Sequence, residues 1–212
     1  MSKTIHISLE ENQFYHIYNR GNDGIDLFYQ NRNYVYFLQK YDNYLSDYID
    51  TYAYCLLPNH FHLLVRVKNK SNFVVCKDRF PRPEDLQCMN EGEIVSELFR
   101  RFFMSYSKSI NAQQSRTGSL FQKNFRRKLV NNELYFTSLV YYIHNQLKHH
   151  GFEHMDDKDY PWSSYSRFLI DKETKLKKSE VLGWFGGKED FIKFHSVKRD
   201  MKEVKGLFIE EA

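Results

Sequence analysis

The stretch from residue 51 to residue 68 constrains the fold more strongly than any other part of the chain. It reads TYAYCLL, then Pro58-Asn59, then HFHLLVRVK. Aromatic and β-branched side chains favour strands, and two such runs separated by a two-residue turn signal are typical of a β-hairpin. In the second run apolar residues alternate with others, so we expect one face of the sheet to contact a core through Phe61, Leu63, Val65 and Val67.

The order of the remaining segments predicts the fold class. We expect a strand at 13–20, a helix at 31–48, the two hairpin strands, a helix at 93–111, a strand at 120–130, and a helix from Asn131 or Asn132 to Gly151. Residues 69–92 read as a long loop, and short helices follow Trp162. The order β-α-β-β-α-β is the split βαβ, or ferredoxin-like, plan. We therefore expect an α+β fold with an antiparallel sheet, followed by a helix and a C-terminal helical extension.

The composition indicates a folded protein outside the membrane. Among its 212 residues, 42% are hydrophobic and 17% are aromatic, well above the content of disordered chains. No apolar run is long enough to span a membrane and the first residues do not resemble a signal peptide, so we expect a cytoplasmic protein. Cys55, Cys76 and Cys88 show no CxxC spacing, and we interpret them as reduced thiols.

Positive charge is concentrated in one segment. Residues 99–132 contain no acid, while the rest of the chain has 23 basic residues against 27 acidic ones, a net charge of −4. Six aromatic side chains are interleaved with the charges, as a nucleic-acid surface requires, although a solvated basic face would look similar. The candidate DNA contacts are Arg100, Arg101, Lys108, Arg116, Lys123, Arg126, Arg127 and Lys128.

Two histidines lie on the side of the hairpin that the apolar alternation leaves open. His60 and His62 share this face, with Cα atoms about 7 Å apart. Two imidazoles at this spacing can bind one metal ion, but a lone His-x-His pair is more often simply a pair of partly exposed strand residues. The pattern therefore needs a third ligand and a reactive group.

The last predicted helix offers both. Tyr142 and Gln146 lie one turn apart on a flank of its apolar stripe, where the tyrosine could attack phosphorus and the amide oxygen could bind a cation. Tyr141 and Asn145 have the same spacing and compete for the role. We expect that second pair to face solvent, because it lies opposite the apolar stripe.

Five blocks of sequence resemble a known family. The strings YHIYNRGN, LPNHFHLLV, TGSLFQKNFRRK, YYIHNQLKHHGF and YPWSSY, within residues 13–170, are similar to the REP-associated tyrosine transposases and to single-tyrosine insertion-sequence transposases. The resemblance implies a metal-binding His-hydrophobe-His motif at His60-Phe61-His62 and a nucleophile at Tyr142. The family's metal-binding Asn falls on Gln146 and its Pro on Leu147, and the insertion-sequence branch resembles this chain in having Gln there.

The resemblance also implies an activity. A catalytic domain at residues 1–170, with a short helical extension at 171–212, would cut single-stranded or hairpin DNA and rejoin it through a 5′-phosphotyrosine. Mg²⁺ or Mn²⁺ is the expected ion for two imidazoles, an amide oxygen and waters. Relatives of this kind imply that a homodimer is possible, and no phosphate-binding Gly-rich loop suggests a nucleotide cofactor.

Two other functions remain open at this point. A non-catalytic protein that binds single-stranded DNA or an RNA hairpin could use the same fold and the basic segment. A structural zinc protein could use His60, His62 and Cys55, although no fourth ligand is obvious.

Overall fold

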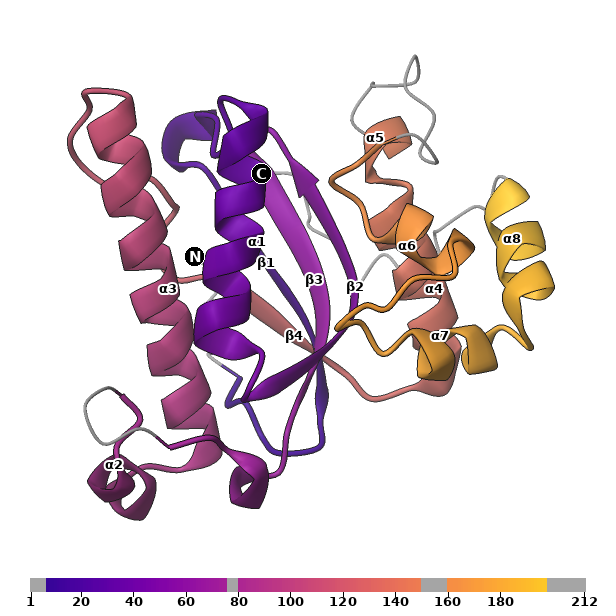
Figure 1. The fold of residues 1–212 in the computed structure, drawn as a ribbon, viewed down its shortest axis with the longest axis horizontal. Helices are drawn as coiled ribbons and strands as arrows, with labels where there is room; N and C mark the ends of the chain where they lie inside the picture. Colours follow the sequence, from indigo (N-terminus) through magenta and orange to yellow (C-terminus); the bar gives the residue numbers. More distant parts are fainter. Residues whose placement is uncertain (1–6, 76–79, 150–159, 198–212) are drawn as a thin grey trace, which may run out of the picture.

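The architecture is a sheet covered by helices on both faces. In a computed structural model, which describes residues 7–75, 80–149 and 160–197, the sheet has four strands (Figure 1). They are β1 (Phe14–Arg20), β2 (Ile49–Leu57), β3 (His60–Val67) and β4 (Arg126–Val130). Their order is β2-β3-β1-β4, and all neighbours are antiparallel, so the predicted α+β class is confirmed.

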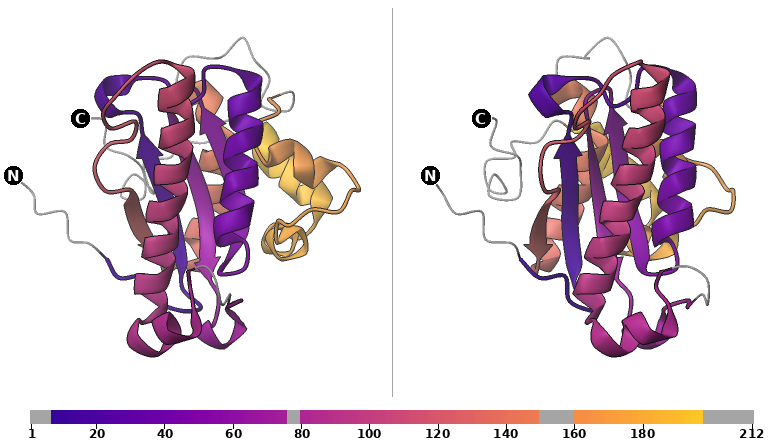
Figure 2. Two further views of the ribbon diagram at one scale, coloured as in Figure 1. Left: turned by 60° about the vertical axis from the view of Figure 1, so that its left-hand side comes forward. Right: turned by 90° about the vertical axis from the view of Figure 1, so that its left-hand side faces the viewer.

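The helices form two layers. They are α1 (Asn31–Leu45), α2 (Pro83–Cys88), α3 (Glu91–Gln113), α4 (Glu133–His144), α5 (Gln146–His149), α6 (Tyr165–Leu169), α7 (Lys178–Trp184) and α8 (Lys188–Ser196), with 3-10 turns η1 (Asn22–Gly24) and η2 (Lys70–Asn72). Helices α1 and α3 cover one face of the sheet, and α4 with the later helices covers the other (Figures 1 and 2). Among the described residues, no helix combines the length and the apolar character that crossing a membrane demands.

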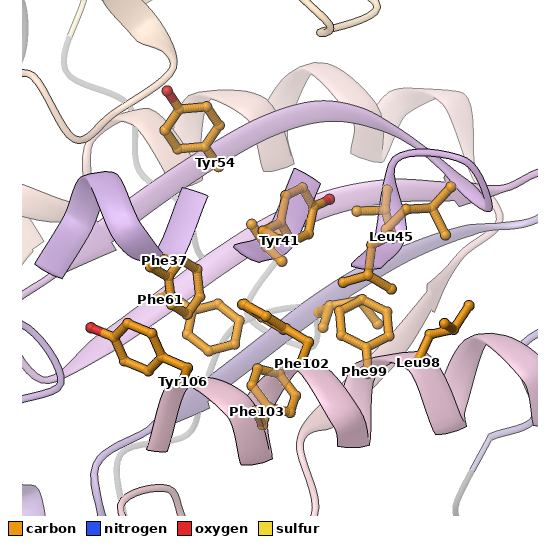
Figure 3. Close-up of a cluster of buried hydrophobic side chains, with 14 of the residues drawn as sticks. Phe37, Tyr41, Leu45, Tyr54, Phe61, Leu98, Phe99, Phe102, Phe103 and Tyr106 are labelled. Carbon is orange, nitrogen blue, oxygen red and sulfur yellow. The ribbon is translucent and has the colours of Figure 1, made fainter. Parts of the chain in front are cut away.

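An aromatic core joins α1 and α3 to the sheet. The ring of Phe37 lies 4.9 Å from Phe102, 5.1 Å from Tyr106 and 5.3 Å from Phe61, measured between centroids (Figure 3). Phe61, Leu63, Val65 and Val67 are all buried in this layer, as the alternation in β3 predicts. Helix α3 begins earlier than predicted because Asn90 and Glu93 form a reciprocal capping box at its first turn.

Two segments differ from the expectation. Residues 69–92 contain η2 and α2 and are therefore not one continuous loop. The predicted strand 120–130 is wrong over its first half, because only Arg126–Val130 pairs regularly with β1. Phe121 instead makes an isolated bridge with Gly21, and the left-handed backbone of Asn124, with φ of 59°, interrupts the ladder before β4.

The helix after β4 is also interrupted. It ends at His144, and α5 begins at Gln146 after a turn at Asn145, whereas the sequence predicts one helix as far as Gly151. Two side-chain amides bind carbonyls of the preceding turn at this point. Asn145 Nδ2 donates to the Tyr141 carbonyl at 2.9 Å, which also accepts the Asn145 backbone N–H at 3.0 Å, and Gln146 Nε2 donates to the Tyr142 carbonyl at 3.0 Å. The predicted end at Gly151 lies outside the described residues.

Candidate active site

The two histidines of β3 lie between the sheet and the second helical layer. His62 pairs with Tyr18 of β1 and His60 with Arg20, so these four residues share the face that α4 covers. The imidazole centroids of His60 and His62 are 5.3 Å apart and the rings are nearly perpendicular. The shared face is confirmed. The expectation that both side chains lie outside a core is wrong, since His60 is 7% exposed and His62 is fully buried by the second layer.

Helix α4 brings a tyrosine to His62, and a buried amide follows in the turn after the helix. The ring of Tyr142 meets His62 edge to face at a centroid distance of 5.6 Å. Gln146 is fully buried and its Nε2 is held by the Tyr142 carbonyl, which fixes the amide plane. Gln146 Oε1 is buried without a hydrogen-bond donor in the described part of the chain. A buried carbonyl oxygen in this state is costly unless something binds it, so it fits a cation ligand.

Tyr141 is not the solvent-facing residue that the helical pattern predicts. Both Tyr141 and Asn145 are buried, at 5% and 4% exposure. The Tyr141 hydroxyl donates to the Val197 carbonyl at 3.1 Å, and its ring contacts His195 of α8. The C-terminal helix therefore covers this side of α4. The ring of the adjacent Tyr142 instead contacts His62 of β3.

Hydrogen bonds at the Nδ1 atoms favour coordination through Nε2. His60 Nδ1 lies 2.7 Å from Asn59 Oδ1, and because that oxygen only accepts, the neutral imidazole has its proton on Nδ1 and its lone pair on Nε2. His62 Nδ1 lies 2.9 Å from His16 Nε2. The Nε2 atoms of His60 and His62 are buried, as is Gln146 Oε1. The donor set is thus two imidazole nitrogens and one neutral oxygen.

This donor set fits a catalytic ion better than a structural zinc. Within the described ranges, no three His, Cys, Asp or Glu side chains are grouped so that they could hold a metal. A zinc site made of His60, His62 and Cys55 therefore has no support in that part of the chain. Two nitrogens and an amide oxygen leave room for water and phosphate oxygens, which Mg²⁺ and Mn²⁺ accept.

The predicted basic segment divides between the two faces of the sheet. Arg126 pairs with Tyr18 and Lys128 pairs with His16, so these two side chains lie on the face of the β3 histidines. Arg127 lies on the opposite face, where it donates to Ser96 Oγ at 2.7 Å. The edge strand β4 thus places two basic residues beside the candidate site.

The other predicted contacts lie elsewhere. Arg100 and Arg101 are on α3, in the layer on the far side of the sheet, and both bind Glu97, at 2.6 and 2.7 Å. Arg116 donates to Asn111 Oδ1 at 2.8 Å in the loop after α3. Lys108 on α3 and Lys123 before β4 are exposed. The structure therefore does not gather the eight basic residues into one surface.

A chain of buried histidines connects α4 to α8, and the sequence pattern did not predict it. His195 Nδ1 donates to the Phe191 carbonyl at 2.8 Å, His144 Nδ1 lies 3.0 Å from His195 Nε2, and His144 Nε2 lies 2.8 Å from Ser164 Oγ. Ser164 Oγ in turn accepts from the Tyr54 amide of β2 at 2.9 Å. Burial lowers the pKa of His144 well below its ordinary value, and His195 lowers it further.

His16 was also missed, although a signal was present. The alternation in FYHIYNR places His16 and Tyr18 on one face of β1 and Tyr15 and Ile17 on the other. His16 is fully buried beside His62. Only the pairing register of β1 with β3, which a single sequence does not give, brings the two rings together.

The described residues thus form a four-stranded antiparallel sheet whose strand β3 carries His60 and His62, with Tyr142 of α4 against His62. No model of a protein family matches the chain. A Haemophilus influenzae protein assigned as a REP-associated tyrosine transposase is 26% identical over 146 residues, covering 59% of this chain and 73% of that protein. The solved structure of a REP-associated tyrosine transposase bound to a REP hairpin has a TM-score of 0.57 and 16% identity, and the match covers 80% of this chain and 86% of that one. Both findings support the REP-associated tyrosine transposases as the family that this chain resembles.

Proposed function

We propose that this protein is a metal-dependent transposase that nicks and rejoins single-stranded or hairpin DNA through a 5′-phosphotyrosine on Tyr142. One observation carries the proposal: the edge of the Tyr142 ring meets His62, and the carbonyl of Tyr142 holds Gln146, whose Oε1 is buried without a donor in the described chain. These contacts support the proposal, because Tyr142 touches one candidate ligand of β3 and is hydrogen-bonded to the candidate ligand that begins α5. A purely structural role gives no reason to bury that oxygen.

The residues have separate tasks in the reaction. His60, His62 and Gln146 would hold a divalent cation, which when bound polarises the scissile phosphate. The Tyr142 hydroxyl oxygen forms a bond to phosphorus while the bond from phosphorus to the 3′ oxygen breaks. In net terms the phenolic proton is transferred to the 3′ oxygen, which leaves as a hydroxyl, so the step neither gains nor loses a proton overall. The phosphodiester energy stays in the tyrosyl ester, so the reverse step can join a new 3′ hydroxyl without ATP.

The substrate proposal rests on the structural relative and on β4. That relative is bound to a REP hairpin. In this chain Arg126 and Lys128 lie on the site face, where they could neutralise the phosphates of a strand that leads to Tyr142. We therefore propose imperfect hairpins with single-stranded flanks as the substrate class.

The test is a trapping experiment with single-stranded DNA that contains an imperfect hairpin from the flanks of the gene. Substrate labelled at its 3′ end should give a labelled protein band on a denaturing gel with Mn²⁺ and none with EDTA. Substrate labelled at its 5′ end should instead release a shorter labelled fragment, because the tyrosine retains the 5′ phosphate. Binding without an adduct would favour the alternative of a non-catalytic hairpin-binding protein.

A further inference from the structure

His16 is a buried imidazole in the candidate site to which none of the reaction steps assigns a task. It lies on the site face of β1, opposite Leu64 of β3 and Lys128 of β4. It is a diagonal neighbour of His62 and is fully buried. Within the described residues His16 forms no metal-binding group of three with the β3 histidines, so it is not a ligand candidate.

The geometry between His16 and His62 is that of a directed hydrogen bond. The N···N distance from His16 Nε2 to His62 Nδ1 is 2.9 Å. The ring planes differ by only 20° and the centroids are 5.1 Å apart. Two imidazoles joined end to end by an N···N contact of 2.9 Å have ring centroids about 5 Å apart, as found here. The hydrogen bond therefore lies close to both ring planes, and the rings are not stacked face to face.

The bond can decide which nitrogen of His62 is able to bind a metal. A neutral imidazole has one protonated and one unprotonated nitrogen. When His16 Nε2 accepts a hydrogen bond from His62 Nδ1, the lone pair of His62 is on Nε2. The hydrogen bond to Asn59 has the same effect on His60, whose lone pair is also on Nε2. The reverse direction would protonate His62 Nε2 and exclude it as a ligand.

We propose that His16 is a positioning residue, which accepts the Nδ1 proton of His62 and thereby fixes the tautomer and ring orientation that binds the divalent cation. The proposal rests on the metal site of the proposed function. Hydrogen-bond acceptors behind a ligating histidine typically contribute a factor of about 10 to 100 in metal affinity. His16→Phe, which keeps a ring of similar size and loses the acceptor, should therefore weaken Mn²⁺ binding by about that factor.

The experiment measures Mn²⁺ affinity by isothermal titration with the full chain, apart from any cleavage assay. His16→Gln places a carbonyl oxygen near the former Nε2 atom and should restore most of the affinity that His16→Phe loses. Tyr15→Phe is the matched control, because it removes the hydroxyl bonds to Glu10 and Ser8 from the opposite face of the same strand. It should lower stability and leave Mn²⁺ affinity unchanged.

The outcomes separate this proposal from the one on which it rests. Absence of Mn²⁺ binding by the wild-type protein, or wild-type affinity in a folded His60→Ala variant, would refute the metal site itself. Wild-type affinity in a folded His16→Phe variant would refute the role of His16 alone. The tautomer of His62 can also be measured in the wild-type protein, so this test does not require any variant to fold. Nitrogen NMR of the metal-free protein should show His62 protonated on Nδ1. Protonation on Nε2 would overturn the proposal.

Discussion

Replacing Tyr142 by Phe removes one oxygen from the site and leaves the ring that meets His62 in place. The cost in stability is at most that of a side-chain hydrogen bond, about 0.5–1.5 kcal/mol, which corresponds to a shift in Tm of roughly 2–4 °C per kcal/mol for a chain of this size. DNA binding should persist, because the ring and the basic residues are unchanged. No covalent adduct should form, since the phenolic oxygen is the proposed nucleophile.

Tyr141→Phe is the matched control at the adjacent position. It loses the hydroxyl bond to the Val197 carbonyl, a comparable loss of about 0.5–1.5 kcal/mol, on the side of α4 that α8 covers. The two variants should therefore have similar melting temperatures and opposite activities in the trapping assay. Peptide mapping of trapped wild-type enzyme should place the nucleotide on Tyr142. An adduct mapped to Tyr141, or formed by Tyr142→Phe, would refute the reasoning from the geometry.

Further predictions concern the metal, the DNA surface and pH. His60→Ala should abolish Mn²⁺-dependent cleavage while circular dichroism still reports a folded protein, and cleavage at the wild-type rate would remove His60 from the ligand set. Replacing Arg126 and Lys128 by Ala should weaken hairpin binding and reduce the slope of log affinity against log salt by roughly two, whereas replacing the two α3 arginines bound to Glu97 should change it little. Binding should favour single strands and imperfect hairpins over blunt duplex, and equal affinity in fluorescence anisotropy would contradict this. Burial lowers the pKa of His144 in the folded protein, so as the pH falls the unfolded chain is protonated at a higher pH than the folded one. The contribution of His144 to the free energy of unfolding should therefore be fully present above about pH 6.5 and should decrease below it. Urea unfolding at about pH 7.5 and about pH 5 checks this sign, and His144→Gln should flatten the dependence.

Features that depend only on neighbouring residues in the sequence were predicted from the sequence. The alternation in β3 gave both of its faces, because a strand has a side-chain period of two whatever lies around it. The pairing of Tyr142 with Gln146 also followed from local geometry, although the helix breaks between them. The break lies beside two buried amide side chains that bind carbonyls of the preceding turn, and helical periodicity does not predict such side-chain bonds.

Long-range packing accounts for what the sequence did not predict. Tyr141 is buried because Val197 and His195, both more than fifty residues later in the chain, cover it. The basic residues of 99–132 are divided because α3 and β4 belong to different layers of the fold. Counting charges along the sequence does not reveal this. The hydrogen bond between His16 and His62 needed the pairing register of β1 with β3.

The two separate hydrophobic clusters on either side of the sheet bear on how the site assembles. The first cluster joins the sheet to α1 and α3, whereas Tyr142 belongs to a second one that includes Phe168, Val181 and Phe191. His60 and His62 lie on a strand in the first half of the chain, whereas Tyr142 packs between that sheet and helices from the second half. If Tyr142 acts as proposed, the site is complete only when α4 and the helices after it dock on the sheet. Partial unfolding confined to that layer would then abolish the proposed reaction while most of the sheet and the aromatic core persist.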